Sequence, residues 1–115
     1  MILTSMLFSS YLEANGYRIL LATDGQQAID LAKAEHPDLI LMDIQMPVID
    51  GIEAIKQIRL DPNLVNIPII ALTALAMAGD RESCLAAGAN EYLSKPIKLK
   101  SLDQMIQTWL NRASQ

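Results

Sequence analysis

The chain alternates between short, solid apolar runs and longer stretches in which apolar residues recur every three or four positions. Solid runs of four to six residues are typical of strands that are buried on both faces of a parallel sheet. The sequence predicts strands of this kind at Arg18–Ala22, Leu39–Met42 and Ile67–Leu72, and a shorter strand at Glu91–Leu93.

The stretches with helical spacing lie before, between and after these runs. The first contains Ile2, Leu3, Met6, Leu7, Tyr11 and Leu12, and Asn15-Gly16 is a good stop for it. After a turn at Thr23-Asp24-Gly25, a second helix contains Ala28, Ile29, Leu31 and Ala32 and ends before Pro37. A third helix opens at Asp50-Gly51 and closes at Asp61-Pro62-Asn63, and two more are predicted over about residues 78–87 and 99–112. Strict alternation of helices and buried strands predicts an α/β fold, a doubly wound parallel sheet in three α/β/α layers. Residues 1–115 show no repeat or linker and are interpreted as a single domain.

Three polar side chains of different chemistry follow three of the predicted strands. Asp43 ends the second strand, Thr73 the third, and Lys95 comes just after the fourth. Because ligands bind beyond the carboxyl ends of parallel strands, we expect these side chains at one edge of the sheet. A carboxylate can act as a nucleophile, while a hydroxyl and an ammonium can bind phosphoryl oxygens. The combination therefore indicates a site that handles a phosphoryl group.

Three motifs carry a resemblance to a known family, and each lies at a strand end. They are PDLILMDIQMPVIDG at residues 37–51, IPIIALTA at 67–74 and YLSKP at 92–96. With these motifs the chain resembles the receiver domain of two-component response regulators, over essentially its whole length. The resemblance implies a flavodoxin-like sheet with strand order 2-1-3-4-5.

The resemblance also implies roles for individual residues. Asp43 would accept a phosphoryl group from a histidine kinase or a histidine phosphotransfer protein. Thr73 and Lys95 would bind that group, and Thr73 with Tyr92 would form the conformational switch. The backbone carbonyl of Gln45 and the Asp43 carboxylate would hold Mg²⁺. The chain would then be a signalling phosphoacceptor rather than an enzyme, either a single-domain regulator or part of a hybrid kinase.

One part of the family pattern is missing from the sequence. Receivers begin with an apolar strand that ends in two adjacent acidic residues, whereas this chain begins at Met1 in a stretch with helical spacing, and it contains no adjacent acidic pair. We therefore expect the first, central strand and the acidic pair to be absent, and the domain to be truncated at its N-terminus. Two alternatives are that the flanking strands close on each other and that a neighbouring chain donates a strand.

Composition narrows the function further. Thirteen acidic and nine basic residues give a formal charge of -4, which argues against a nucleic-acid partner. The sequence has no apolar run of membrane-spanning length and no basic leader, so we expect a cytoplasmic protein without a membrane partner. The single cysteine, Cys84, excludes an internal disulfide and is interpreted as a packing residue. Asp24 and Asp50, each before a glycine, are interpreted as turn or helix-cap residues.

Two other functions compete with the phosphoacceptor. A pseudo-receiver would keep the fold and bind partners without phosphorylation, because its metal site is incomplete. A flavodoxin-like cofactor binder would share the sheet, but no Gly-rich or Ser/Thr-rich phosphate loop follows a strand, and aromatic residues make up only 4% of the chain. A homodimer is a further possibility in the family, through a surface that corresponds here to residues 78–87, 91–93 and 99–112.

Overall fold

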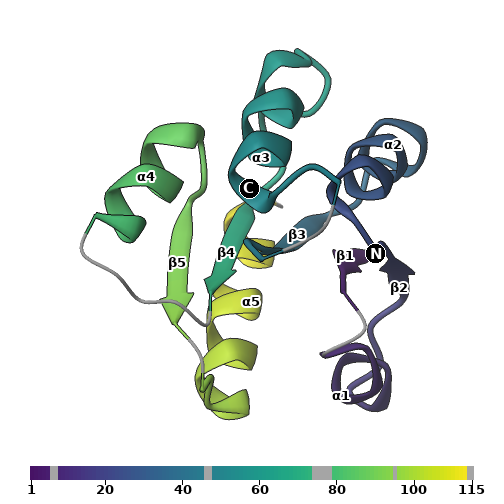
Figure 1. Cartoon of the computed structure of the whole chain (residues 1–115). Helices are drawn as coiled ribbons and strands as arrows, with labels where there is room; N and C mark the ends of the chain where they lie inside the picture. Colours follow the sequence, from purple (N-terminus) through teal and green to yellow (C-terminus); the bar gives the residue numbers. More distant parts are fainter. Residues whose placement is uncertain (6–7, 46–47, 74–78, 95, 114–115) are drawn as a thin grey trace.

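The computed structural model describes residues 1–5, 8–45, 48–73, 79–94 and 96–113. Its strands and helices alternate along the whole chain (Figure 1). They are β1 (Ile2–Thr4), α1 (Ser9–Ala14), β2 (Ile19–Leu21), α2 (Gly25–Glu35), β3 (Leu39–Asp43), α3 (Gly51–Leu60), β4 (Ile69–Thr73), α4 (Asp80–Ala87), β5 (Glu91–Ser94) and α5 (Leu99–Ala113). The strands form one parallel sheet in the order β2-β1-β3-β4-β5, so the predicted doubly wound α/β fold is confirmed.

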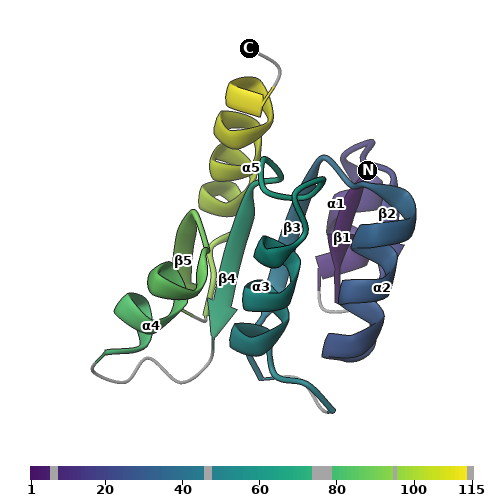
Figure 2. The same cartoon turned by 90° about the horizontal axis from the view of Figure 1, so that it is seen from above.

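The helices cover both faces of this sheet. Helices α2, α3 and α4 lie on one face and α1 and α5 on the other, as Figures 1 and 2 show from two directions. Each face has its own buried apolar cluster, one built around Ile55 and Ile58 of α3 and the other around Leu102 and Ile106 of α5. Strand β3 supplies side chains to both clusters, which explains why its sequence is solidly apolar.

The expectation that the first strand is absent is wrong. Residues Ile2–Thr4 form β1 in the middle of the sheet, with Ile2 paired to Ile19 on one side and to Leu39 on the other. Hydrogen bonds continue this pairing beyond the strand, from the amide of Ala22 to the carbonyl of Thr4 at 3.0 Å. The flanking strands therefore do not close on each other, and no strand from a second chain is needed.

The physical reason for this error lies in the burial of β1 on both faces. Ile2 packs into the cluster beneath α5 and Leu3 into the cluster beneath α3, and each is only 1% exposed. A strand buried in this way shows no alternation of apolar and polar residues, and a short apolar run does not distinguish strand from helix. The helix that the spacing predicted is present, but it starts at Ser9 instead of near Ile2.

The helix starts behave as the sequence predicts. The Asp24 carboxylate accepts a hydrogen bond from the Gln27 amide at 2.8 Å, and the Asp50 carboxylate accepts one from the Glu53 amide at 2.9 Å. Both aspartates are therefore N-caps, which satisfy amides that have no partner within the helix. Helix α4 ends at Gly88, as predicted.

Arg59 fixes the amino edge of the sheet, opposite the candidate site. Its guanidinium donates to the carbonyls of Gly88 (2.9 Å), Leu64 and Val65 (both 3.1 Å) and to the side-chain oxygen of Asn90 (2.8 Å). Gly88 has φ +123°, and a Cβ there would lie 2.5 Å from Cγ of Arg59. One partly buried side chain therefore ties the end of α3 to the turn that leads into β5.

The central position of β1 can be tested by truncating Leu3. Because this side chain is 1% exposed, Leu3→Ala is expected to lower the free energy of unfolding by about 2–5 kcal/mol. The measurement is urea denaturation followed by circular dichroism. The matched control is Leu60→Ala, whose side chain is 81% exposed and whose loss is expected to change stability by about 0.5 kcal/mol or less. Equally small effects of both substitutions would contradict the placement of β1.

Candidate phosphoacceptor site

The carboxyl ends of β3 and β4 bring together two of the predicted site residues. Asp43 is the last residue of β3 and is paired in register with Leu72, so Thr73 lies one position further along the neighbouring strand. The amide of Ile44 donates to the carbonyl of Leu72 at 2.9 Å and extends the pairing past Asp43. The Thr73 side chain is buried, at 1% exposed, whereas Asp43 is only partly buried. The carboxylate thus remains accessible beside a hydroxyl held in the core.

Gln45 connects these two residues. Its backbone amide donates to Oδ1 of Asp43 at 3.1 Å, and its side-chain amide donates to Oγ1 of Thr73 at 2.6 Å. The family resemblance implies only a backbone role in metal binding for Gln45. The side-chain contact could not be found from the sequence, because residues 45 and 73 become neighbours only through the pairing of β3 and β4.

The loop between β3 and α3 is held by two glycines that allow close approach. A Cβ on Gly25, at the start of α2, would collide with the backbone carbonyl of Ile49, and one on Gly51 would lie 2.5 Å from the backbone carbonyl of Asp43. The amide of Gly51 also donates to the carbonyl of Ile44 at 3.1 Å. Ile49 packs against the core, while its neighbour Val48 is 80% exposed. The described residues of this loop therefore pack closely against the starts of α2 and α3.

Val48 has an unusual conformation in this loop. Its φ is +70°, in the left-handed region, which is sterically unfavourable for a β-branched residue. Its exposed side chain is not part of either core cluster. No residue pattern in the sequence signals this strained conformation.

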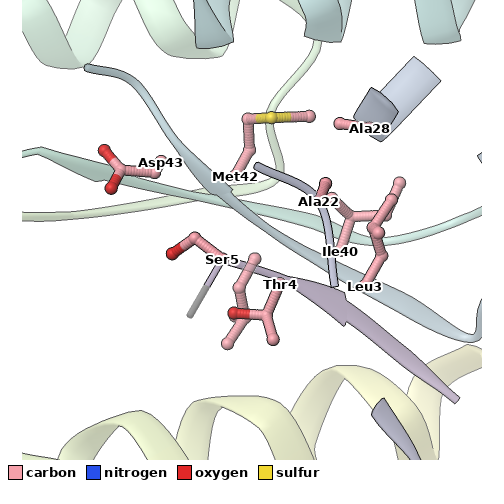
Figure 3. Close-up of a pocket in the computed structure, with 9 residues that line it drawn as sticks. Leu3, Thr4, Ser5, Ala22, Ala28, Ile40, Met42 and Asp43 are labelled. Carbon is pink, nitrogen blue, oxygen red and sulfur yellow. The ribbon is translucent and has the colours of Figure 1, made fainter. Parts of the chain in front are cut away.

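The carboxyl end of β1 presents hydroxyl groups instead of carboxylates. Thr4 and Ser5 stand there, and with Asp43 they line a cavity of about 10 Å³ whose other walls are mostly apolar (Figure 3). This space is close to the minimum for one water molecule and far below the several hundred Å³ of a typical cofactor pocket. Figure 3 shows the Ser5 hydroxyl and the Asp43 carboxylate on the same side of the cavity.

Thr4 is the one buried polar side chain without a hydrogen-bond partner among the described residues. Its Oγ1 is inaccessible to solvent, and the whole residue is 2% exposed. In Figure 3 the Thr4 side chain extends away from Leu3, on the opposite side of the β1 backbone. A buried hydroxyl left in this way costs about 1–3 kcal/mol. The end of β1 is therefore a weak point in an otherwise well-satisfied sheet.

The donor set meets the lower limit of what Mg²⁺ requires. Mg²⁺ keeps several waters and binds through one or two carboxylates together with phosphate oxygens of the substrate. Asp43 supplies one carboxylate, and the described residues contain no group of three acidic, histidine or cysteine side chains that could hold a metal. These residues therefore fit a weakly bound Mg²⁺ whose remaining ligands would come from water and the phosphodonor.

The other two predicted site residues lie on or after β5. Tyr92 is half-buried and packs against the cluster beneath α3 and α4, in register with Ala71 of β4. Partial burial and the carboxylate of Asp80 raise the pKa of the Tyr92 hydroxyl above its usual value, so this group stays protonated at neutral pH. Lys95 lies outside the described residues.

Sheet order, a carboxylate at the end of β3 and a buried threonine at the end of β4 define a flavodoxin-like fold with its site at the carboxyl edge. A family model, the response regulator receiver domain, matches residues 2–107. The chain therefore belongs to the response regulator receiver family. The resemblance found in the sequence is confirmed, although the strand thought to be absent is part of the sheet.

Relatives and solved structures agree with this family. The polar-differentiation response regulator DivK of Brucella ovis is 43% identical over 111 residues, which cover 96% of this chain and 90% of the relative. The receiver domain of the sensor histidine kinase PA1611 of Pseudomonas aeruginosa, crystallised with a magnesium ion coordinated in its active-site cleft, is 43% identical, with a TM-score of 0.88 and 96% of each chain covered.

A third similar structure contains a partner protein. It is the receiver domain of the response regulator Ssk1 of Saccharomyces cerevisiae, in complex with the histidine phosphotransfer protein Ypd1. That match is 33% identical, with a TM-score of 0.83, and covers 94% of this chain and 86% of the other. In this chain, no helix among the described residues is long and apolar enough to cross a membrane.

The strain at Val48 leads to a prediction about stability. Val48→Gly removes the unfavourable left-handed conformation of a β-branched residue, which costs about 1–3 kcal/mol, and is expected to raise the free energy of unfolding by about 1 kcal/mol. The matched control is Val65→Gly, in a turn where φ is negative; there the added freedom of glycine is expected to cost about 0.5–1 kcal/mol. Urea denaturation measures both, and a loss of stability at both positions would contradict the strain.

Proposed function

We propose that this receiver domain is the phosphoacceptor of a two-component phosphorelay and takes its phosphoryl group onto Asp43 from a histidine kinase or a histidine phosphotransfer protein. The observation that carries the proposal is the placement of a partly exposed carboxylate beside the buried Thr73 hydroxyl, at the carboxyl ends of adjacent strands. Relatives named as response regulators and the solved complex of a receiver with a phosphotransfer protein support it.

The chemical step needs little from the protein beyond position and charge. A carboxylate oxygen of Asp43 forms a bond to phosphorus as the phosphorus–nitrogen bond of the donor histidine breaks. The histidine nitrogen keeps the electron pair and takes up a proton from solvent. The Thr73 hydroxyl donates to a phosphoryl oxygen, and Lys95 is proposed to supply the positive charge. Mg²⁺ held through Asp43 and the Gln45 carbonyl would neutralise charge on the transferring group.

The response to phosphorylation is proposed to pass through Thr73 and Tyr92. The aspartyl phosphate adds about 1.5 to 2 negative charges next to Thr73. Movement of Thr73 toward the phosphate vacates space at the end of β4, and the Tyr92 ring on the neighbouring strand is placed to turn into it. Because the Tyr92 hydroxyl stays protonated, the ring moves as a neutral group.

The signalling state would be read by other proteins. We propose that the domain works in the cytoplasm, as a phosphoacceptor rather than as an enzyme with its own substrate turnover, and without nucleic-acid or membrane partners. A homodimer is proposed to use the face formed by α4, β5 and α5. On this face a hollow of about 330 Å³ is lined by Glu91 of β5 and by Met105 and Trp109 of α5, among others.

A pseudo-receiver is the second candidate, and one observation favours it. Thr4 and Ser5 occupy the end of β1, so among the described residues Asp43 has no acidic cluster with which to hold a metal. Without the ion, phosphorylation would be slow, and the domain would act only by binding partners.

Phosphorylation can be tested directly on the purified chain. Incubation with Mg²⁺ and phosphoramidate, followed by intact-mass measurement, is expected to show weak labelling that depends on Mg²⁺, because a single carboxylate holds the ion poorly. Asp43→Asn is expected to abolish labelling. Asp30→Asn, which removes an exposed carboxylate on α2, is expected to leave it unchanged. A chain that takes up no phosphoryl group at any Mg²⁺ concentration would be a pseudo-receiver.

A further inference from the structure

Gln45 is the only described residue for which hydrogen bonds to both Asp43 and Thr73 are seen. Its backbone amide contacts Oδ1 of Asp43 at 3.1 Å and its side-chain amide contacts Oγ1 of Thr73 at 2.6 Å. The Gln45 side chain lies at the exposed rim, whereas Thr73 is 1% exposed. An amide at the surface therefore holds a hydroxyl that lies in the core.

This contact matters because of what the Thr73 hydroxyl must do. A hydroxyl has one proton to donate and two lone pairs that accept. In the structure the Gln45 amide occupies one lone pair and restrains Oγ1. When a phosphoryl group on Asp43 draws the hydroxyl toward itself, Oγ1 moves, and the contact with Gln45 has to lengthen or break. The hydrogen bond therefore favours the arrangement without phosphate.

We propose that Gln45 is a positioning residue that holds Thr73 in its resting conformation through the hydrogen bond from its side-chain amide. The inference rests on the proposed function, since it assigns Gln45 a part in the same switch. A single hydrogen bond of this kind shifts an equilibrium about 2- to 10-fold. Gln45 thus sets how readily the domain switches, without contacting the transferring group through its own side chain.

The substitution that tests this role is Gln45→Met. Methionine has nearly the same length as glutamine but no N–H donor, and position 45 is exposed, so the fold is expected to tolerate it. The backbone amide that contacts Asp43 remains in place. The matched control is Gln107→Met on α5, where an exposed side-chain amide donates to Asp103 at 3.1 Å, away from the edge that carries Asp43.

Two measurements distinguish a positioning role from a merely structural one. The first is NMR of the Thr73 side chain without phosphodonor, in which three-bond couplings report its χ1 populations. Gln45→Met is expected to broaden these populations and Gln107→Met to leave them as in the wild type. The second is titration with beryllium fluoride and Mg²⁺, an analogue of the phosphoryl group; Gln45→Met is expected to bind it about 2- to 10-fold more tightly.

The outcomes separate this inference from the proposed function. If the wild-type protein binds no beryllium fluoride and takes up no phosphoryl group, the proposed function is contradicted. The three-bond couplings of Thr73 would still test whether the Gln45 side chain restrains Thr73. Unchanged Thr73 couplings in Gln45→Met would overturn the inference. So would unchanged or weaker binding of beryllium fluoride by a Gln45→Met protein that melts at the wild-type temperature.

Discussion

The fold depends on a three-residue strand that has neighbours on both sides. Strand β1 joins β2 to the β3–β4–β5 part of the sheet, and its residues Ile2 and Leu3 fill one core each. In a parallel sheet every strand pairs through backbone hydrogen bonds, and a vacant central position would leave two edges unsatisfied. The burial of two side chains and the pairing of two edges explain why so short a segment adopts strand geometry.

The same strand determines the character of the site. Its carboxyl end brings Thr4 and Ser5 next to Asp43 and contributes no carboxylate. Gly25 and Gly51 allow close approach to the backbone of Ile49 and Asp43, and Val48, next to Ile49, has a positive φ. The site thus combines a firmly placed carboxylate, the proposed phosphoacceptor Asp43, with few metal ligands among the described residues. In the proposed reaction Asp43 is well placed to accept a phosphoryl group, but few negatively charged ligands hold Mg²⁺ beside it. The extent of phosphorylation therefore depends on how tightly the metal binds.

Much of this arrangement can be predicted from the sequence, and the exceptions have physical causes. The strands around Leu39–Met42 and Ile67–Leu72 and the caps at Asp24 and Asp50 follow from patterns local in sequence, and the structure confirms them. The motifs around Asp43 and Thr73 also identify the family correctly. Strand β1 was missed because burial on both faces removes the alternation by which a strand is recognised. The contact from Gln45 to Thr73 and the strain at Val48 depend on residues that meet only in the folded chain.

Among the described residues, more hydrogen bonds are seen at the amino edge of the sheet than at the carboxyl edge. This difference is compatible with the proposed switch at Thr73 and Tyr92. At the amino edge Arg59 of α3 donates four hydrogen bonds to the turn after α3 and to the approach to β5. The side-chain oxygen of Asn90 also accepts a hydrogen bond from the amide of Ile69, at 2.8 Å. At the carboxyl edge Thr73 is held by a neutral amide on an exposed side chain. A single bond of this kind is weak, whereas four hydrogen bonds from one partly buried guanidinium are together harder to break. Charge arriving at Asp43 would therefore move the carboxyl ends of β4 and β5 while their amino ends stay in place. In the proposed switch, a change confined to one edge would reach the α4–β5–α5 face without unfolding the core.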